Sequence, residues 1–253
     1  MIFRDDALAG KRILVTGATS GIGRDAAAMM AACGARLALV GRDAERLQRT
    51  LAELQGEGHA AEQADIGSAD AAHDLLVRLA RDGGAFDGVF HAAGAAAVRM
   101  AKLLNVAHLE TMMGAALYGA LGIAKACAKQ SVMADGGSIL FMSSVAGQRG
   151  TAGMVGYSAA KAAIGGLTRS LAAELAPRGT RVNEIVAGAI ETEMHAAITG
   201  NLDAASQDAY RDLHMLGFGK TDDVSAAAIF LLSDAARWIT GSSMVVDGGY
   251  MAQ

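Results

Sequence analysis

The chain has 253 residues, a formal net charge of −4 at pH 7, 52% hydrophobic residues and only 4% aromatic residues. It contains no basic run longer than two residues, which argues against a nucleic-acid-binding face, because such a face needs clustered Lys and Arg. No apolar run reaches the ~18 residues of a membrane-spanning helix, and residues 1–12 lack the apolar core of a signal peptide, so we expect a cytoplasmic protein without a membrane partner.

Apolar runs alternate with amphipathic segments along the chain. In chain order, we expect strand 11–16, helix 22–33, strand 36–40, helix 43–55, strand 59–63, helix 68–82, strand 86–91, helix 106–134, strand 138–143, helix 154–176, strand 180–186, helix 222–233 and strand 243–247. Most of these strands are apolar on both faces, which is typical of a parallel sheet covered on both sides. The pattern predicts an α/β fold over residues 1–253: a single-domain, Rossmann-like doubly wound parallel sheet with helices on both faces.

Residues 190–220 form the one long stretch without a clear helical or strand period. Long irregular segments in compact domains are usually lids or binding loops, so we expect a substrate lid at about 190–220. Met100, Met154 and Met215 indicate an adaptable apolar wall for the substrate.

The two cysteines, Cys33 and Cys127, lie far apart in helical patterns. Their separation does not match the spacing of metal ligands. We expect reduced core cysteines and no metal site.

A glycine-rich segment, TGATSGIG (16–23), leaves the first expected strand and enters the first expected helix. Its glycines permit a tight turn and let a pyrophosphate and the neighbouring strand approach the backbone, while the N–H groups of the helix start face an anion. This context predicts a dinucleotide site. The expected cofactor contacts in this segment are Gly17, Thr19, Ser20, Gly21, Ile22 and Gly23.

The end of the second expected strand discriminates between NAD and NADP. Enzymes that use NAD usually place an acidic side chain there, which hydrogen-bonds the ribose. This chain has Gly41 followed by Arg42, whose guanidinium can bind a 2′-phosphate through two hydrogen bonds, while Asp43 is expected to cap the next helix. We therefore expect NADP as the cofactor, with NAD as the alternative.

Tyr157 and Lys161 lie four residues apart in GYSAAKAAIGG (156–166) and share one face of the expected helix. In isolation, this spacing is more often a solvated Lys packed on a Tyr than a site. The rest of the chain reverses that preference.

The motifs together resemble the short-chain dehydrogenase/reductase family, in the form of about 250 residues that includes the 3-oxoacyl-carrier-protein reductases. The resemblance covers nearly the whole chain. The motifs that carry it are TGATSGIG (16–23), Asp65, HAAG (91–94), SSVAG (143–147), YSAAK (157–161), RVNEIVAGAIETEM (181–194) and DGGY (247–250).

The resemblance implies an oxidoreductase that transfers hydride between a nicotinamide and a ketone or secondary alcohol. It assigns the acid/base role to Tyr157, the substrate oxygen to Ser144, and the lowering of the tyrosine pKa to Lys161, which also contacts the nicotinamide ribose. An ammonium beside a phenol favours the phenolate, which is needed because a free phenol titrates near ~10. By the same resemblance, the remaining cofactor contacts are Asp65, Ile66, Ala92, Gly94, Ile190 and Thr192.

The chain departs from the family pattern in three places, the first of which covers two positions. His91 and Ala92 replace two asparagines, and we expect His91 to be a hydrogen-bonded core residue. Ala187 replaces a proline. Ala116 stands where the family has an asparagine that holds a water beside the lysine, so turnover is either served by another group or reduced.

Two alternatives stay open: an NAD-dependent dehydrogenase of the same family, and a cofactor-binding protein with little turnover, which only Ala116 favours. The identity of the substrate and the direction of the reaction are not predicted.

The expected helices 106–134 and 154–176 carry small and apolar residues around most of their circumference. Members of the family pair these helices, so the resemblance implies a homotetramer or homodimer.

Overall fold

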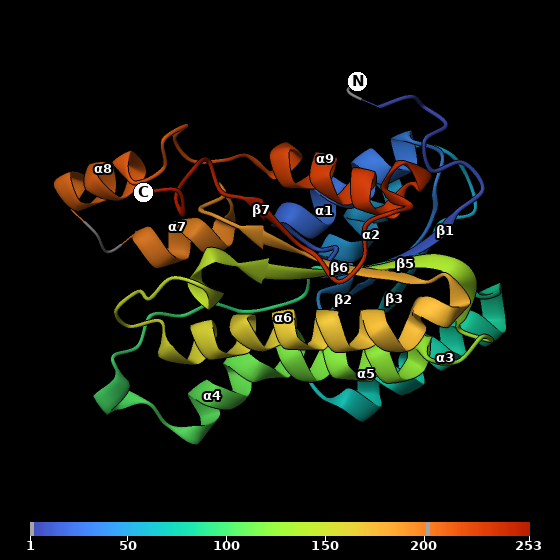
Figure 1. The fold of residues 1–253 in the computed structure, drawn as a ribbon, viewed down its shortest axis with the longest axis horizontal. Helices are drawn as coiled ribbons and strands as arrows, with labels where there is room; N and C mark the ends of the chain where they lie inside the picture. The colour runs from blue at the N-terminus through green and yellow to red at the C-terminus, as the bar shows by residue number, and fades with distance from the viewer. Residues whose placement is uncertain (1–2, 201–202) are drawn as a thin grey trace.

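One parallel sheet organises the computed structural model, which describes residues 3–200 and 203–253 (Figure 1). Its strands lie in the order β3-β2-β1-β4-β5-β6-β7 within these residues. They are β1 (Arg12–Thr16), β2 (Arg36–Gly41), β3 (Ala60–Gln63), β4 (Phe86–His91), β5 (Met133–Ser144), β6 (Arg181–Ala187) and β7 (Ser243–Val246). Every residue of β1 and β6 is buried, as expected for strands covered on both faces.

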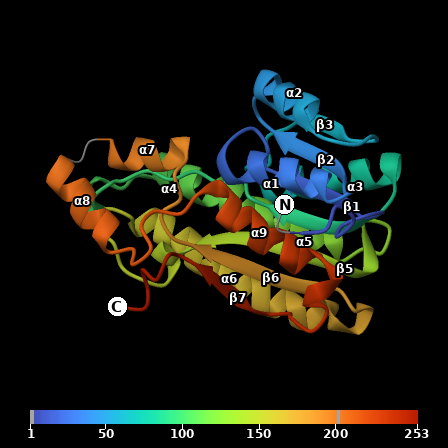
Figure 2. The same cartoon turned by 90° about the horizontal axis from the view of Figure 1, so that it is seen from above.

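Helices cover both faces of the sheet (Figures 1 and 2). The α-helices are α1 (Gly21–Ala32), α2 (Ala44–Glu53), α3 (Ala69–Gly83), α4 (Val106–Met113), α5 (Gly119–Cys127), α6 (Val155–Leu175), α7 (Glu193–Thr199), α8 (Ala204–Asp212) and α9 (Thr221–Leu232). Short 3₁₀ turns occupy Ala101–Leu103, Val145–Gly147, Ala176–Arg178 and Asp234–Ala236, and a π-helical turn, η2, occupies Gly114–Tyr118. One apolar core joins α1, α2 and α9 to the sheet, and a second joins α3, α5 and α6 to its other face. This is the doubly wound architecture that the sequence predicts.

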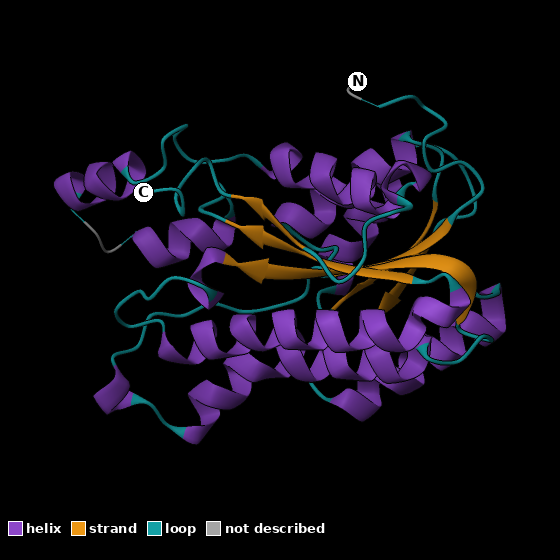
Figure 3. Cartoon of the chain, in the orientation of Figure 1, coloured by secondary structure: helices purple, strands orange, loops and turns teal. Residues whose placement is uncertain are grey.

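The strand order reverses direction at β1, which pairs with β2 on one side and with β4 on the other. In open parallel sheets, ligands bind at such a switch point, outside the carboxyl ends of the strands. The strand arrows in Figure 3 point toward the end of the molecule where α7 and α8 lie. The functional site is therefore expected at that end.

Two expectations about elements are wrong. The segment 190–220 is not irregular, because it contains α7 and α8, whose first turns are capped by Thr192 and Asp203. The expected helix 106–134 is instead three pieces, α4, η2 and α5, and strand β5 already begins at Met133. Helices α7 and α8 have only 7 and 9 residues, so neither is long enough to show a clear amphipathic pattern in the sequence.

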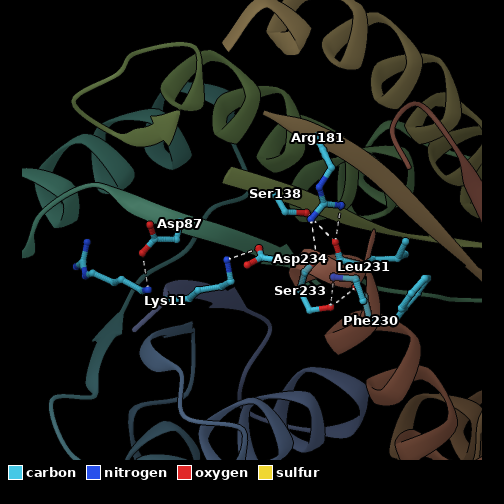
Figure 4. Close-up of polar contacts among 10 residues, drawn as sticks. Lys11, Asp87, Ser138, Arg181, Phe230, Leu231, Ser233 and Asp234 are labelled. Atoms are coloured by element: carbon cyan, nitrogen blue, oxygen red, sulfur yellow. Dashed lines mark hydrogen bonds and ion pairs between the residues drawn. The ribbon is translucent and has the colours of Figure 1, made fainter. Parts of the chain in front are cut away.

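At the opposite end of the sheet, polar contacts join strands β5 and β6 to the last turn of α9 (Figure 4). Arg181 of β6 is buried and donates to the carbonyls of Leu231 (2.7 Å) and Ser233 (3.1 Å). The Ser138 hydroxyl of β5 donates to the same Leu231 carbonyl (2.9 Å), and Lys11 pairs with Asp234 (2.8 Å). Arg181 and Ser138 satisfy carbonyls that a helix end leaves without partners, and these hydrogen bonds hold the end of α9 against the sheet.

Candidate active site

The connection between β1 and α1 is shaped by glycines. Gly17 has φ +71°, and a Cβ there would lie 2.8 Å from the nitrogen of Ala93. A Cβ on Gly23 would lie 2.3 Å from the carbonyl oxygen of Gly17. The N-cap residue of α1, Ser20, makes no side-chain capping bond, so its side chain leaves the N–H groups of the first turn open to a ligand. This arrangement suits a phosphate group.

The carboxyl end of β2 carries no acidic side chain that points into the site. A Cβ on Gly41 would lie 2.3 Å from Cγ2 of Thr19, so the threonine already fills that space. Arg42 follows, exposed at the rim of the cavity. Asp43 is the N-cap of α2 and accepts from the N–H of Arg46 (3.0 Å), which confirms its predicted capping role.

Ser144, Tyr157 and Lys161 lie together where β5 ends against α6. Ser144 is the last residue of β5, and its Oγ accepts from the N–H of Ala146 (3.2 Å). Lys161 is buried and donates from Nζ to the carbonyl of Met142 (2.9 Å). Its Nζ lies 5.8 Å from the centre of the Tyr157 ring.

The protein environment shifts the pKa values of both titratable groups. Burial raises the pKa of Tyr157, and the hydrogen bond with the Ser144 hydroxyl opposes that shift. Burial lowers the pKa of Lys161 to about 8, while the negative charge of Glu184 opposes the lowering. The site therefore places a lysine with a lowered pKa on the same cavity wall as a buried tyrosine.

His91 is a core residue, as the sequence predicts. Its Nδ1 shares a hydrogen bond with Thr16 Oγ1 (2.8 Å), and its Nε2 lies 2.9 Å from the carbonyl oxygen of Ala115. Burial lowers the pKa of His91 to about 4, so the ring is neutral at pH 7.

Ala116 occupies the π-helical turn η2 and is buried. A Cβ on Gly94 would lie 3.6 Å from Lys161 Nζ and 3.7 Å from the Cβ of Ala116. Ala116 and the Lys161 ammonium therefore both lie next to Gly94, and the methyl group of Ala116 has no hydrogen-bonding atom.

One cavity of about 480 Å³ brings the predicted residues together. All of the predicted catalytic and cofactor-binding residues line it. The predicted residues among its lining are Gly17, Thr19, Ser20, Gly21, Ile22, Gly23, Arg42, Asp65, Ile66, Ala92, Gly94, Ser144, Tyr157, Lys161, Ile190 and Thr192. Of the three methionines expected in the substrate wall, only Met154 lines the cavity, because Met100 and Met215 are exposed elsewhere.

Several lining residues were not predicted individually. His195 of α7, Tyr210 of α8 and Tyr250 line the cavity from the lid side. The His195 and Tyr210 rings stack with centroids 6.2 Å apart, and Arg149 Cζ lies 4.4 Å above the ring of Tyr250. The sequence signal for two of them was that His195 and Tyr210 are polar aromatic residues within the expected lid, 190–220. Only the fold shows that their side chains line the cavity.

A metal centre has no support in the described ranges, 3–200 and 203–253, where no group of three His, Cys, Asp or Glu side chains could hold an ion. Cys33 and Cys127 are buried free thiols, as expected, and burial raises the pKa of both. Within the same residues, no helix is both long and apolar enough to cross a membrane.

Comparisons with known proteins agree with this geometry. Residues 17–251 match the family model described as Enoyl-(Acyl carrier protein) reductase. The chain is 37% identical to the D-threitol dehydrogenase of Mycolicibacterium smegmatis, with 97% of this chain and 95% of that protein covered.

Solved structures give the same result. A putative short-chain alcohol dehydrogenase from Sinorhizobium meliloti has a TM-score of 0.89 and 32% identity, covering 99% of this chain and 100% of the other. A blue fluorescent protein from a metagenomic library, solved in complex with NADPH, has a TM-score of 0.86 and 28% identity, covering 96% and 99% of the two chains.

Proposed function

Because the chain belongs to the short-chain dehydrogenase/reductase family, we propose that it is an NADP(H)-dependent oxidoreductase acting on a ketone or secondary alcohol. The observation that carries the proposal is the meeting of Ser144, Tyr157 and Lys161 on one cavity wall that continues to the glycine-lined start of α1. We further propose that residues 1–253 act as one dinucleotide-binding and catalytic domain.

A nicotinamide dinucleotide fits the residues present. The close backbone approaches at Gly17 and Gly23 leave no room for side chains but leave the first N–H groups of α1 free for a pyrophosphate. Asp65, Ile66, Ala92 and Gly94 would contact the adenosine half. Lys161, Ile190 and Thr192 would contact the nicotinamide half. When bound, the cofactor supplies or accepts the hydride.

Tyr157 would exchange the proton that accompanies hydride transfer. In reduction, the phenol donates its proton to the substrate oxygen, which the Ser144 hydroxyl holds in place. In oxidation, the phenolate accepts the proton of the alcohol. Burial raises the pKa of Tyr157 and the Ser144 hydrogen bond opposes that shift; in this proposal, the Lys161 ammonium would in addition stabilise the phenolate that oxidation requires.

The choice of NADP rests on the end of β2. Thr19 fills the space beside Gly41, and Arg42 is the charged side chain at the rim. A guanidinium forms paired hydrogen bonds with a phosphate, whereas a carboxylate at this place would repel one. The structural neighbour solved with NADPH supports this choice, and NAD remains the alternative.

We propose an uncharged substrate with hydroxyl groups beyond the reacting carbon. Tyr210, Tyr250 and His195 offer polar groups on the lid side, and burial lowers the pKa of His195, which favours the neutral ring. The acid at the start of α7, Glu193, is paired with Arg46 of α2 (2.7 Å). The name of the D-threitol dehydrogenase relative supports a polyol. In this proposal, α7 and α8 form the substrate lid.

A cofactor-binding protein with little turnover is the second candidate, and the buried Ala116 beside Lys161 is the observation that favours it. One assay separates the two. The protein is mixed with NADP⁺ or NAD⁺ and a panel of tetritols and secondary alcohols, and the formation of reduced nicotinamide is followed. We expect turnover with NADP⁺, and its loss in Tyr157→Phe without loss of cofactor binding. Tight cofactor binding with no turnover on any alcohol or matching ketone would favour the second candidate.

A further inference from the structure

A carboxylate is buried between α6 and β6, the strand next to the edge of the sheet. Glu184 belongs to β6, pairs in register with Phe141 of β5 and Ser243 of β7, and is only 2% exposed. Its neighbours in the strand include Val182, Ile185 and Val186, which are apolar core residues. Burying a carboxylate without full compensation is costly, so its presence needs a physical reason.

Only one of the two carboxylate oxygens of Glu184 accepts a hydrogen bond among the described residues. Oε1 accepts from the hydroxyl of Ser243 (2.5 Å), whereas Oε2 is buried without a hydrogen-bond partner among the described residues. The carboxylate lies against the backbone of α6, because a Cβ on Gly165 would come within 3.0 Å of Oε1. The glycine therefore leaves the space that Glu184 uses.

Gly165 is one helical turn after Lys161, so the Glu184 carboxylate and the Lys161 ammonium share the interface between α6 and the sheet. Lys161 Nζ donates to the carbonyl of Met142, and Met142 is the strand neighbour of Phe141, the register partner of Glu184. The two charged groups thus lie along one buried seam, by which we mean the interface of α6 with strands β5 and β6. The negative charge of Glu184 favours the charged form of the lysine.

The other charged and titratable groups near this seam do not replace that interaction. Arg169 of α6 also approaches Gly165, but its side chain is exposed and forms no ion pair with Glu184 in the part of the chain that the structure describes. From β4, His91 is neutral at pH 7. On α6, the other titratable group is Tyr157, whose phenolate Lys161 is proposed to stabilise. On η2, the residue next to Gly94 is Ala116, which has no titratable group.

We propose that Glu184 is a positioning residue for the reaction, acting as the buried counter-charge that keeps Lys161 an ammonium beside Tyr157. The inference rests on the proposed function of Lys161. It offers an account of how the site works with Ala116 in place of a polar residue: support for the ammonium comes from the sheet below rather than from η2. Without Glu184, Lys161 would lose its proton at a lower pH, and Tyr157 would lose its cationic neighbour.

The direct test is the titration of Lys161 in the protein alone, which needs no substrate. The chain has six lysines, so selective ¹³C labelling gives few side-chain signals, and Lys161→Met assigns the one of interest. We expect Glu184→Gln to lower the pKa of Lys161 by about one pH unit or more. Glu174→Gln, which removes the same charge from the exposed face of α6, is expected to leave it unmoved.

A second readout uses the alcohol of the panel above that the wild type oxidises fastest. If the pKa of Lys161 falls from about 8 by about one unit, the protonated fraction at pH 8 falls about fivefold and that at pH 6 hardly changes. Turnover of Glu184→Gln should follow the same pattern, and Glu184→Asp, which keeps the charge, should recover part of the loss. A purely structural role would lower activity equally at both pH values.

An unchanged Lys161 titration in folded Glu184→Gln would overturn the inference, whatever the change in melting temperature. Should Glu184→Gln fail to fold, the pair Glu184→Asp and Glu184→Asn, equal in size and different in charge, repeats the comparison. Absence of any turnover in the wild type would contradict the proposed function instead, and the titration would still decide the role of Glu184.

Discussion

Arg42 is the single side chain on which the proposed cofactor preference depends. It follows Gly41 at the carboxyl end of β2 and lies exposed at the rim of the cavity. The adjacent carboxylate, Asp43, accepts a hydrogen bond from the first turn of α2 and does not line the cavity. A 2′-phosphate would meet a guanidinium here and no opposing charge.

Replacing Arg42 by Ala should therefore weaken NADP⁺ binding about tenfold or more and leave NAD⁺ binding nearly unchanged, since a hydrogen bond to a charged group contributes about 1.5–3 kcal/mol. Dissociation constants from titration calorimetry test this expectation. Arg49→Ala, on the exposed surface of α2, is the matched control for the loss of charge. Equal losses for both cofactors would argue against a 2′-phosphate contact.

Ala116 is the residue whose replacement tests proton delivery. Its Cβ and Lys161 Nζ both adjoin Gly94, so an asparagine at this position would bring an amide group closer to the ammonium. We expect Ala116→Asn to raise turnover by about twofold or more, a small part of what a positioned proton-transfer group can contribute, with cofactor affinity little changed.

The measurement is steady-state turnover across pH, together with a thermal melt, because overpacking at this buried site can cost about 1–3 kcal/mol. Ala128→Asn, at the exposed position directly after α5, controls for the introduction of an asparagine in this part of the chain. A folded Ala116→Asn protein with an unchanged pH profile would mean that another group, such as Glu184 acting through Lys161, already serves the need.

At the scale of single residues, the sequence predicts best where a motif has a strict spacing. Most of the glycine segment lines one cavity together with Ser144, Tyr157 and Lys161, while the roles assigned to these residues stay predictions. Glu184 was not anticipated, because it lies inside an apolar strand and its surroundings depend on the pairing of β5, β6 and β7. No local pattern in the sequence reports such long-range contacts.

At the scale of elements, most strands and the helix α6 were predictable, whereas the short capped helices α7 and α8 and the division of residues 106–134 into α4, η2 and α5 were not. The observed range of β4 is the predicted one, 86–91. The observed range of α6 is one residue shorter at each end than the predicted helix, 154–176. In contrast, α7 and α8 are held by their capping residues and by the aromatic contacts of Tyr210 and His195. Such helices are too short for hydrophobic periodicity to identify them.

The end of α9 gives an element-scale test of what fastens the helix to the sheet. Arg181→Met should lower the free energy of unfolding by about 2–4 kcal/mol, because the carbonyls of Leu231 and Ser233 would lose a charged donor in a buried place. Urea unfolding measures the change. Arg237→Met, exposed nearby, should leave the midpoint within experimental error, and equal midpoints for both variants would contradict the assigned role of Arg181.

For the whole molecule, we predict assembly through the outer faces of α4 to α6. Val106, Tyr118, Leu121 and Val155 are exposed on these elements, although they are large apolar residues. Leaving such a surface in water is unfavourable, and closed two-fold assemblies are the common solution. Sedimentation velocity at micromolar concentration should give a dimer or tetramer, and Leu121→Glu should shift it toward monomer. A wild type that sediments only as a monomer would refute this arrangement.

The most direct test of the proposed function follows the hydride itself. Wild type and Tyr157→Phe are each incubated with NADPH deuterated at the nicotinamide C4 position and with ketones matching the alcohol panel, and products are analysed by mass spectrometry. We predict that the wild type places deuterium on the carbinol carbon, and that Tyr157→Phe binds NADPH equally well but transfers almost none. Deuterium transfer by Tyr157→Phe at the wild-type rate would contradict the account.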